Sequence, residues 1–373
     1  MNETLTIRNF GPIKDMSFEF KKINILIGDQ GTGKSTVAKL VSAIKNAKNL
    51  KLFDLPENET EQFFGHLDLM GIKSYLQKNT FILYESDNYI AKFEANKISI
   101  NRTSSFHEIM FFNFNYIPAE RNMVHVLADS LYALIDVKAA LPKLFLRFGN
   151  KYQTARKDKN EFNFNKILGI VFTHKNNGDY VLLPNGNEIY LSDASSGIQG
   201  CVALLIVVDS VTTEHLPSGT RELKKNNLGL LVIEEPELNC FPETQNKIIK
   251  YIVDRNTISW IDNNSKNSVL EKTPLKNQLI VTTHSPYILT SLNNLMYAFS
   301  VGKLHHDEVS KVIEKKYWVN PDDVSAYMLL PNGKCEGVLD SEGLIKAEKI
   351  DSVSAILNKD FNAIMDIELN IKK

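Results

Sequence analysis

The chain has 373 residues, of which 43% are hydrophobic, so it can form one large domain or two smaller ones around a substantial core. Its formal net charge of −1 does not indicate a nucleic-acid or membrane partner, although it leaves room for local basic patches that bind nucleic acid. Residues 1–9 do not look like a signal peptide, and the longest apolar run, residues 201–208, is too short to cross a bilayer.

The first half of the chain predicts strands that alternate with helices. Residues 23–27 form an apolar run that ends at Gly28, which is typical of a strand buried on both faces of a sheet. Apolar residues then recur at helical spacing over 37–44. The other predictions here are two strands within 5–20, a surface connection at 54–66, strands at 80–102 and 111–117, a helix within 124–148, and a charged, mobile segment at 150–165.

The second half continues the alternation. A hairpin is predicted around the turn at 184–186, and the apolar residues from Ile198 to Val211 predict a helix. The remaining predictions are a polar loop at 212–227, buried strands at 228–233, 279–282 and 296–301, a helix at 244–253, a polar loop at 262–277, and a last hairpin that turns at 331–333. Strands that alternate with helices predict an α/β fold around a central sheet.

Cysteine usage indicates the cellular compartment. Cys201, Cys240 and Cys335 are far apart in the sequence, form no CxxC pair and are odd in number. This pattern argues against a disulfide framework and predicts a cytoplasmic location.

The segment after the first buried strand fits the pattern GxxxxGK[ST] at every position. In such a P-loop, glycines let backbone N–H groups approach the phosphates, and the N-terminus of the next helix attracts the anion. We expect Lys34 to contact the β- and γ-phosphates of a nucleotide and Ser35 to ligate Mg²⁺. The predicted nucleotide-binding residues are Gly28, Asp29, Gln30, Gly31, Thr32, Gly33, Lys34, Ser35 and Thr36. The alternative, a glycine turn before an ordinary helix, does not need this complete pattern.

Two adjacent carboxylates follow the strand predicted at 228–233. Sheets of α/β proteins place their ligands at the carboxyl ends of strands. We therefore assign Glu234 to the Mg²⁺ and Glu235 to the attacking water, which a carboxylate can polarise. The alternative is an acidic loop after a strand, which the presence of a P-loop disfavours.

Two further segments have weaker signals. Residues 193–199, with the sequence DASSGIQ, precede an apolar helix, where Ser195 is either a helix cap or a phosphate sensor. His284 follows the strand predicted at 279–282, and it approaches the γ-phosphate if that strand lies beside the carboxylate strand. A histidine in such a place is more often structural, so both interpretations stay open.

The order of P-loop, SSGIQ, EEPE and TTHSP resembles the ABC-type ATPases, and more narrowly the head domains of the SMC and OLD-like (overcoming lysogenization defect) ATPases. Residues 5–13 resemble the strand before their P-loop, residues 118–121 their PAER segment, and residues 234–242 their EEPE…HP segment. The chain departs from the family pattern at three places: SSGIQ replaces LSGGQ, Glu234 replaces Asp, and Phe241 stands where relatives often have His.

The resemblance implies a P-loop fold of the ABC/SMC-head type, with a central mixed sheet flanked by helices, an antiparallel β subdomain and a helical arm. It implies four segments: an N-terminal ATPase lobe (1–122), an arm with a β-hairpin (123–190), a C-terminal ATPase lobe (191–302) and a C-terminal α/β extension (303–373).

It also implies a homodimer in which ATP on one P-loop meets the signature residues of the other chain, here Ser195, Ser196, Gly197 and Gln199. His284 would be the switch histidine, catalytic together with Glu235, and ATP and Mg²⁺ are the implied cofactors.

The leading hypothesis for function is an ATPase whose ATP-dependent dimerisation controls a separate effector, a nuclease or a toxin, in bacterial genome defence or DNA repair. One alternative is the nucleotide-binding subunit of an ABC transporter. Another is a nucleotide-gated binding protein with little turnover. We see neither a TOPRIM-type nuclease cluster nor a long coiled coil in the sequence.

Overall fold

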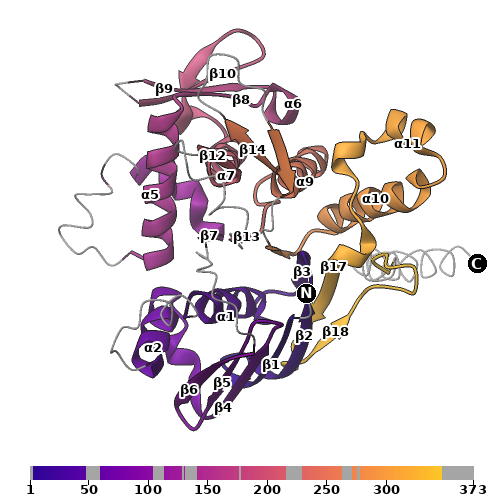
Figure 1. The fold of residues 1–373 in the computed structure, drawn as a ribbon. Helices are drawn as coiled ribbons and strands as arrows, with labels where there is room; N and C mark the ends of the chain where they lie inside the picture. The colour runs from indigo at the N-terminus through magenta and orange to yellow at the C-terminus, as the bar shows by residue number, and fades with distance from the viewer. Residues whose placement is uncertain are drawn as a thin grey trace, which may run out of the picture.

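The fold was analysed in a computed structural model, which describes residues 3–47, 59–103, 113–127, 130, 141–175, 178–215, 229–262, 271–274 and 278–346. Strands and helices alternate along these residues and build layers around a central sheet. In Figure 1 the N-terminal strands lie at the bottom, α5, α7 and α9 lie above them, and α10 and α11 lie to the right. The predicted α/β fold is confirmed.

A six-stranded sheet forms the centre. Its order is β18–β17–β3–β16–β13–β7, and all neighbours are parallel except β17 and β18. The strands are β3 (Ile23–Gly28), β7 (Asn113–Ile117), β13 (Gly229–Glu234), β16 (Gln278–Thr283), β17 (Val324–Leu329) and β18 (Cys335–Gly337). Every residue of β13 and β16 is buried, as expected for parallel strands covered on both faces.

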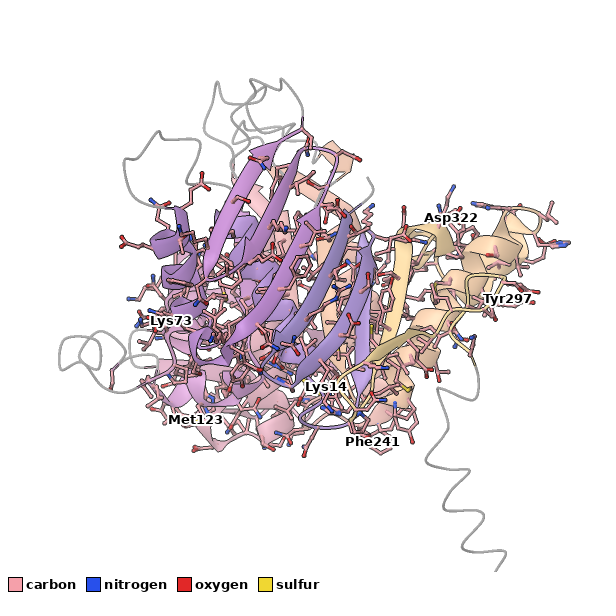
Figure 2. The ribbon with its side chains drawn as sticks, turned by 90° about the horizontal axis from the view of Figure 1, so that it is seen from below. Lys14, Lys73, Met123, Phe241, Tyr297 and Asp322 are labelled. Atoms are coloured by element: carbon pink, nitrogen blue, oxygen red, sulfur yellow. The ribbon has the colours of Figure 1, made fainter. Side chains whose placement is uncertain are left out.

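One face of the central sheet packs on α1 (Lys34–Ala47) and on an antiparallel sheet. That sheet has the order β2–β1–β4–β5–β6, and its strands run side by side in the view of Figure 2, with β17 and β18 beside them. The strands are β1 (Glu3–Phe10), β2 (Ile13–Phe20), β4 (Leu76–Glu85), β5 (Tyr89–Glu94) and β6 (Lys97–Arg102). Their inward residues, such as Leu5 and Phe18, share one core with Val37 and Val41 of α1 and with Val232 of β13.

The opposite face packs on four long helices. These are α5 (Lys143–Asp158), α7 (Ser196–Thr212), α9 (Pro242–Thr257) and α10 (Pro286–Gly302). Helix α7 is buried almost all round from Gly200 to Asp209, which explains its continuous apolar sequence. Alternation along β13 sends Leu231 and Ile233 into this second core, so the central sheet lies between two apolar layers.

Smaller elements complete the described part of the chain. The hairpin predicted around 184–186 is confirmed by β10 and β11, and the hairpin predicted at 331–333 by β17 and β18. The strands are β8 (Glu161–Asn163), β9 (Val171–Lys175), β10 (Gly178–Leu182), β11 (Glu188–Tyr190), β12 (Thr213–His215), β14 (Ile258–Asp262) and β15 (Glu271–Pro274). The short helices are α2 (Glu59–Leu69), η2 (Lys73–Tyr75), η3 (Ala119–Met123), α3 (Val124–Leu127), α6 (Asn165–Leu168), η5 (Leu191–Asp193), α11 (His306–Val312), η6 (Lys315–Tyr317) and η7 (Pro321–Asp323).

The strand predicted at 296–301 is wrong, because these residues belong to α10. Ser285 caps this helix by accepting a hydrogen bond from the backbone N–H of Tyr287, and Pro286 stands in its first turn. Buried residues then recur at helical spacing, among them Leu292, Leu295 and Met296. A short apolar run at the end of a longer helix does not by itself distinguish strand from helix.

Three predicted irregular segments also contain regular structure. The segment at 150–165, which was predicted to be charged and mobile, contains the end of α5 and the strand β8. Residues 59–66 lie in α2 rather than in a connection, and residues 271–274 of the predicted loop at 262–277 form β15. Residues 54–58, 131–140, 216–227, 263–270 and 275–277, on which parts of the predictions fall, lie outside the described residues.

The C-terminal extension contributes to the central sheet. Strand β17 pairs in parallel with β3, which places Val324 opposite Ile23, and the turn at Gly333 accepts a hydrogen bond from the backbone N–H of Lys14. This edge therefore supports the strand that carries the P-loop. No helix in the described ranges is long and apolar enough to cross a membrane.

Candidate nucleotide-hydrolysis site

The P-loop connects β3 to α1 in a conformation that requires glycine. Gly28, Gly31 and Gly33 have φ angles of 143°, 76° and 101°, which residues with a side chain rarely adopt. A Cβ atom on Gly28 would collide with the backbone oxygen of Leu329 on β17. The crest of the loop, residues 29–31, is exposed, so its backbone faces solvent where a phosphate would bind.

Lys34 lies across this loop. Its Nζ donates hydrogen bonds to the carbonyl oxygens of Gly28 and Asp29, each at 2.8 Å. Burial lowers the pKa of Lys34, and nearby carboxylates, Glu235 foremost, oppose that lowering. The ammonium group therefore lies in the field of the carboxylates that follow β13, as the predicted pairing of P-loop and carboxylates requires.

Glu234 ends β13 with its side chain buried. The hydroxyl of Tyr116 donates to its Oε1 at 2.6 Å, and the backbone N–H of Ala119 donates to its Oε2 at 3.2 Å. Burial, together with the Glu234 carboxylate, raises the pKa of Tyr116 well above its usual value, so this phenol remains a donor. Both carboxylate oxygens are thus oriented by partners on or just after β7, which the sequence did not predict.

Glu235 and His284, the two predicted catalytic residues, meet at the edge of the sheet. Strands β13 and β16 pair in a register that places Glu234 opposite Thr282, so the residues that follow both strands emerge side by side. The Oε1 of Glu235 lies 3.3 Å from the Nε2 of His284, and about 30% of each side chain is exposed. Glu235 has a φ of 44°, a conformation that is unfavourable for a residue other than glycine and is often found at functional sites.

Glu237 positions the backbone of His284. Its Oε1 accepts hydrogen bonds from the Thr283 hydroxyl at 2.8 Å and from the His284 backbone N–H at 2.7 Å. Sequence reasoning gave this residue no role. The signal that was present is the third carboxylate of the EEPE segment, two positions after Glu235.

Arg121 holds the backbone of Glu234 and of Glu235. It is 1% exposed, and its guanidinium donates to the carbonyl oxygens of Glu234 at 2.7 Å and of Glu235 at 2.6 Å. Burial lowers the pKa of Arg121. The last residue of the PAER segment thus contacts the site with its side chain, at the backbone of the two glutamates.

The signature residues lie at the N-terminus of α7. Ser195 accepts a hydrogen bond from the backbone N–H of Ile198 at 3.4 Å, so it does act as a helix cap, while Ser195 and Ser196 remain exposed. The Gln199 side chain donates to the carbonyl oxygens of Ser192 and Ala194, each at 2.8 Å. Within the described residues, no hydrogen bond or ion pair joins this segment to the P-loop of the same chain.

Gly197 brings α7 close to the turn that follows the carboxylates. A Cβ atom at position 197 would lie 2.5 Å from the backbone oxygen of Asn239, closer than real Cβ atoms approach an oxygen. A side chain here would push the helix away from that turn. Gly197, the third residue of SSGIQ, is therefore needed for packing within one chain.

One comparison with known protein families indicates an ATPase domain. Residues 134–289, less than half of the chain, match the AAA ATPase domain family. This segment contains the signature residues, the EEPE segment and His284, whereas the P-loop precedes it. The match indicates an ATPase domain over these residues, and the predicted P-loop stands directly after β3 of the central sheet. No curated protein matches the sequence significantly.

Solved structures with a similar arrangement include an SMC head bound to the C-winged helix domain of ScpA, with 11% identity, a TM-score of 0.43, and coverage of 90% of this chain and 97% of that chain. The recombination mediator RecF has 11% identity, a TM-score of 0.41, and coverage of 91% and 98%. The SMC head domain from Thermotoga maritima has 11% identity, a TM-score of 0.34, and coverage of 78% and 91%. We draw no functional conclusion from these likenesses.

Proposed function

We propose that the protein hydrolyses ATP, with Glu235 as the group that orients and deprotonates the attacking water and His284 as its partner near the γ-phosphate. The observation that carries this proposal is the contact of 3.3 Å between Glu235 and His284. Glu235 is also the carboxylate that acts most strongly on Lys34. A phosphate bound by Lys34 would therefore lie beside a general base and a second polar group, which is what attack by water requires.

Mg²⁺ fits the oxygen donors at this edge. The ion prefers oxygen ligands and is usually held by few protein groups together with the phosphates. Ser35 is the second residue of α1 and Glu234 is the last residue of β13, and we propose that their side-chain oxygens hold the ion or its water shell. Tyr116 and Ala119 occupy one acceptor position on each Glu234 oxygen, which keeps the carboxylate oriented. When bound, the ion neutralises charge on the phosphates.

The signature residues support a site shared between two copies of the chain. Ser195 and Ser196 are exposed at the N-terminus of a helix of 17 residues, and such a terminus attracts anions. The neighbouring turn exposes 76% of Phe241, a large apolar side chain that a partner surface would cover. We propose that Ser195, Ser196, Gly197 and Gln199 act on the nucleotide of a second copy.

The wider role follows by analogy with ATPase heads. We propose that the ATP-bound homodimer works in the cytoplasm and controls a separate effector, a nuclease or a toxin, in genome defence or DNA repair. The fold and the candidate hydrolysis site support this role. Among the described residues, no three metal-ligating side chains gather as they do in a metal-dependent nuclease centre. The nature of the neighbouring gene would identify the effector.

The test compares Glu235→Gln with Glu94→Gln, a matched control in the exposed hairpin of the antiparallel sheet. Removing a general base costs roughly a hundredfold or more in rate, so Glu235→Gln should lose turnover while it retains ATP binding. Glu94→Gln should keep wild-type turnover. Phosphate release and calorimetric ATP affinity are the measurements. Turnover by Glu235→Gln at the wild-type rate would overturn the proposed role of Glu235.

A further inference from the structure

Two cysteines that are distant in the sequence meet beside the turn that follows Glu234 and Glu235. The Sγ atoms of Cys201 and Cys240 lie 2.9 Å apart, and both residues are free thiols. Cys201 belongs to α7, one turn after Gly197, and Cys240 ends the turn that follows the carboxylates. The spacing of 39 residues along the chain gave no indication of this contact, which the sequence analysis did not foresee.

The surroundings of the two thiols make them unequal. The hydrogen bond with Cys201 lowers the pKa of the Cys240 thiol, and the Arg121 guanidinium contributes to the lowering, although burial opposes it. The same hydrogen bond and burial raise the pKa of Cys201. Cys201 is 2% exposed, whereas Cys240 is only partly buried. Because the thiolate is the reactive form of cysteine, Cys240 is the sulfur that meets an oxidant first.

We propose that Cys201 and Cys240 are a redox-modification site that forms a reversible disulfide between α7 and the turn after β13. Hydrogen peroxide is the class of oxidant that fits. The Cys240 thiolate attacks one peroxide oxygen, the O–O bond breaks, and hydroxide leaves, which gives a sulfenic acid. The Cys201 sulfur then attacks the Cys240 sulfur, an S–S bond forms, and water leaves with the Cys201 proton. Two thiols are oxidised and one peroxide is reduced to two waters.

Such a disulfide would join the N-terminal part of α7, which carries the signature residues, to the turn that follows Glu234 and Glu235. Gly197 and Asn239 already touch, and Cys201 and Cys240 form the next contact along the same two segments. Arg121 links this region to the Glu235 carbonyl at 2.6 Å. Resting on the proposed function, we infer that oxidation fixes the signature helix to the carboxylate turn and stops turnover. Disulfides in a reducing cytoplasm are usually transient and regulatory.

The first experiment treats the full-length protein with hydrogen peroxide, blocks the remaining thiols with iodoacetamide and maps linked peptides by mass spectrometry. We expect one linkage, between residues 201 and 240, with loss of two hydrogen atoms and full reversal by dithiothreitol. Cys335 is the matched control, because its thiol is half-buried and donates to the backbone of Ser17 far from this pair. Cys335→Ser should retain the linkage, and Cys240→Ser should lose it.

This measurement uses no nucleotide, so it tests the linkage even if the proposed ATPase activity fails. Three alkylated thiols after peroxide, or a sulfinic acid on Cys240 without linkage, would overturn the proposal. Peroxide should also abolish turnover reversibly in wild-type protein and in Cys335→Ser, but not in Cys240→Ser. Linked protein that turns over ATP at the full rate would refute the inferred control. Because Cys201 is buried, Cys201→Ala serves as a second variant, with folding checked by circular dichroism.

Discussion

Replacing Arg121 by methionine should damage both the stability and the chemistry of the site. Methionine keeps most of the length of the side chain and removes the guanidinium that donates to the carbonyl oxygens of Glu234 and Glu235. Hydrogen bonds from a charged donor contribute about 1.5–3 kcal/mol each. Two of them therefore contribute about 3–6 kcal/mol. The variant no longer buries a charge, so the free energy that this burial costs must be subtracted from the loss.

The lowered pKa of Arg121 shows that its burial disfavours the charged form. We therefore expect a net loss of about 3 kcal/mol in the free energy of unfolding, measured by urea denaturation. The control is Arg8→Met, because the Arg8 side chain is 55% exposed and its pairing with Asp15 is a surface contact. That variant should change the free energy of unfolding by less than about 0.5 kcal/mol.

The effect on turnover has a separate cause. Glu235 has a φ of 44°, and a backbone in that region relaxes unless its surroundings hold it. Without the Arg121 contact its carboxylate should shift, and a shift of about 1 Å can cost on the order of a hundredfold in rate. ATP affinity should change little, because Arg121 donates to none of the P-loop residues. Wild-type stability together with wild-type turnover in Arg121→Met would refute this reasoning.

Three further predictions concern single residues. Lys34→Ala should weaken ATP binding about tenfold or more, since it removes a charge-assisted contact, and near-wild-type affinity by calorimetry would contradict the P-loop assignment. Glu234→Gln should weaken ATP binding only when Mg²⁺ is present, and equal weakening in the presence of EDTA would contradict the metal role. Burial lowers the pKa of Lys151 to about 8 from the usual 10.5. The unfolded chain then binds more protons than the folded chain between these values, so the free energy of unfolding should rise with pH across this window. In Lys151→Met that rise should be smaller. Identical pH profiles of the free energy of unfolding for the wild-type protein and Lys151→Met, measured by urea denaturation, would contradict this role of Lys151.

Much of the site could be predicted because its determinants are local. A P-loop needs glycines and a lysine at fixed spacing, and the residues of β13 that precede its last residue, Glu234, are all apolar. The meeting of Glu235 with His284 needed one further fact, which the sequence analysis stated only as a condition, namely that β16 pairs with β13. The hairpins were predictable for the same reason, since Pro, Asn and Gly in sequence specify a turn.

The residues that were missed act through contacts between distant segments. Tyr116 reaches the Glu234 carboxylate, and Arg121 reaches the backbone carbonyls of Glu234 and Glu235, only because β7 pairs with β13. The two cysteines meet only because α7 packs against the turn that follows β13. The wrong strand at 296–301 has a different cause. Its residues are apolar enough for either structure, and the cap at Ser285 that decides for a helix lies eleven positions upstream of Met296.

The central claim is that two copies of the chain share each ATP site, and a mixture of Ser195→Arg and Lys34→Ala chains tests it most directly. Each variant alone should be inactive. A mixed dimer has one site with both defects and one with neither, so an equal mixture should regain up to about a quarter of wild-type turnover. Native mass spectrometry would confirm that mixed dimers form. A mixture that contains mixed dimers and yet stays as inactive as each variant alone would contradict the shared site.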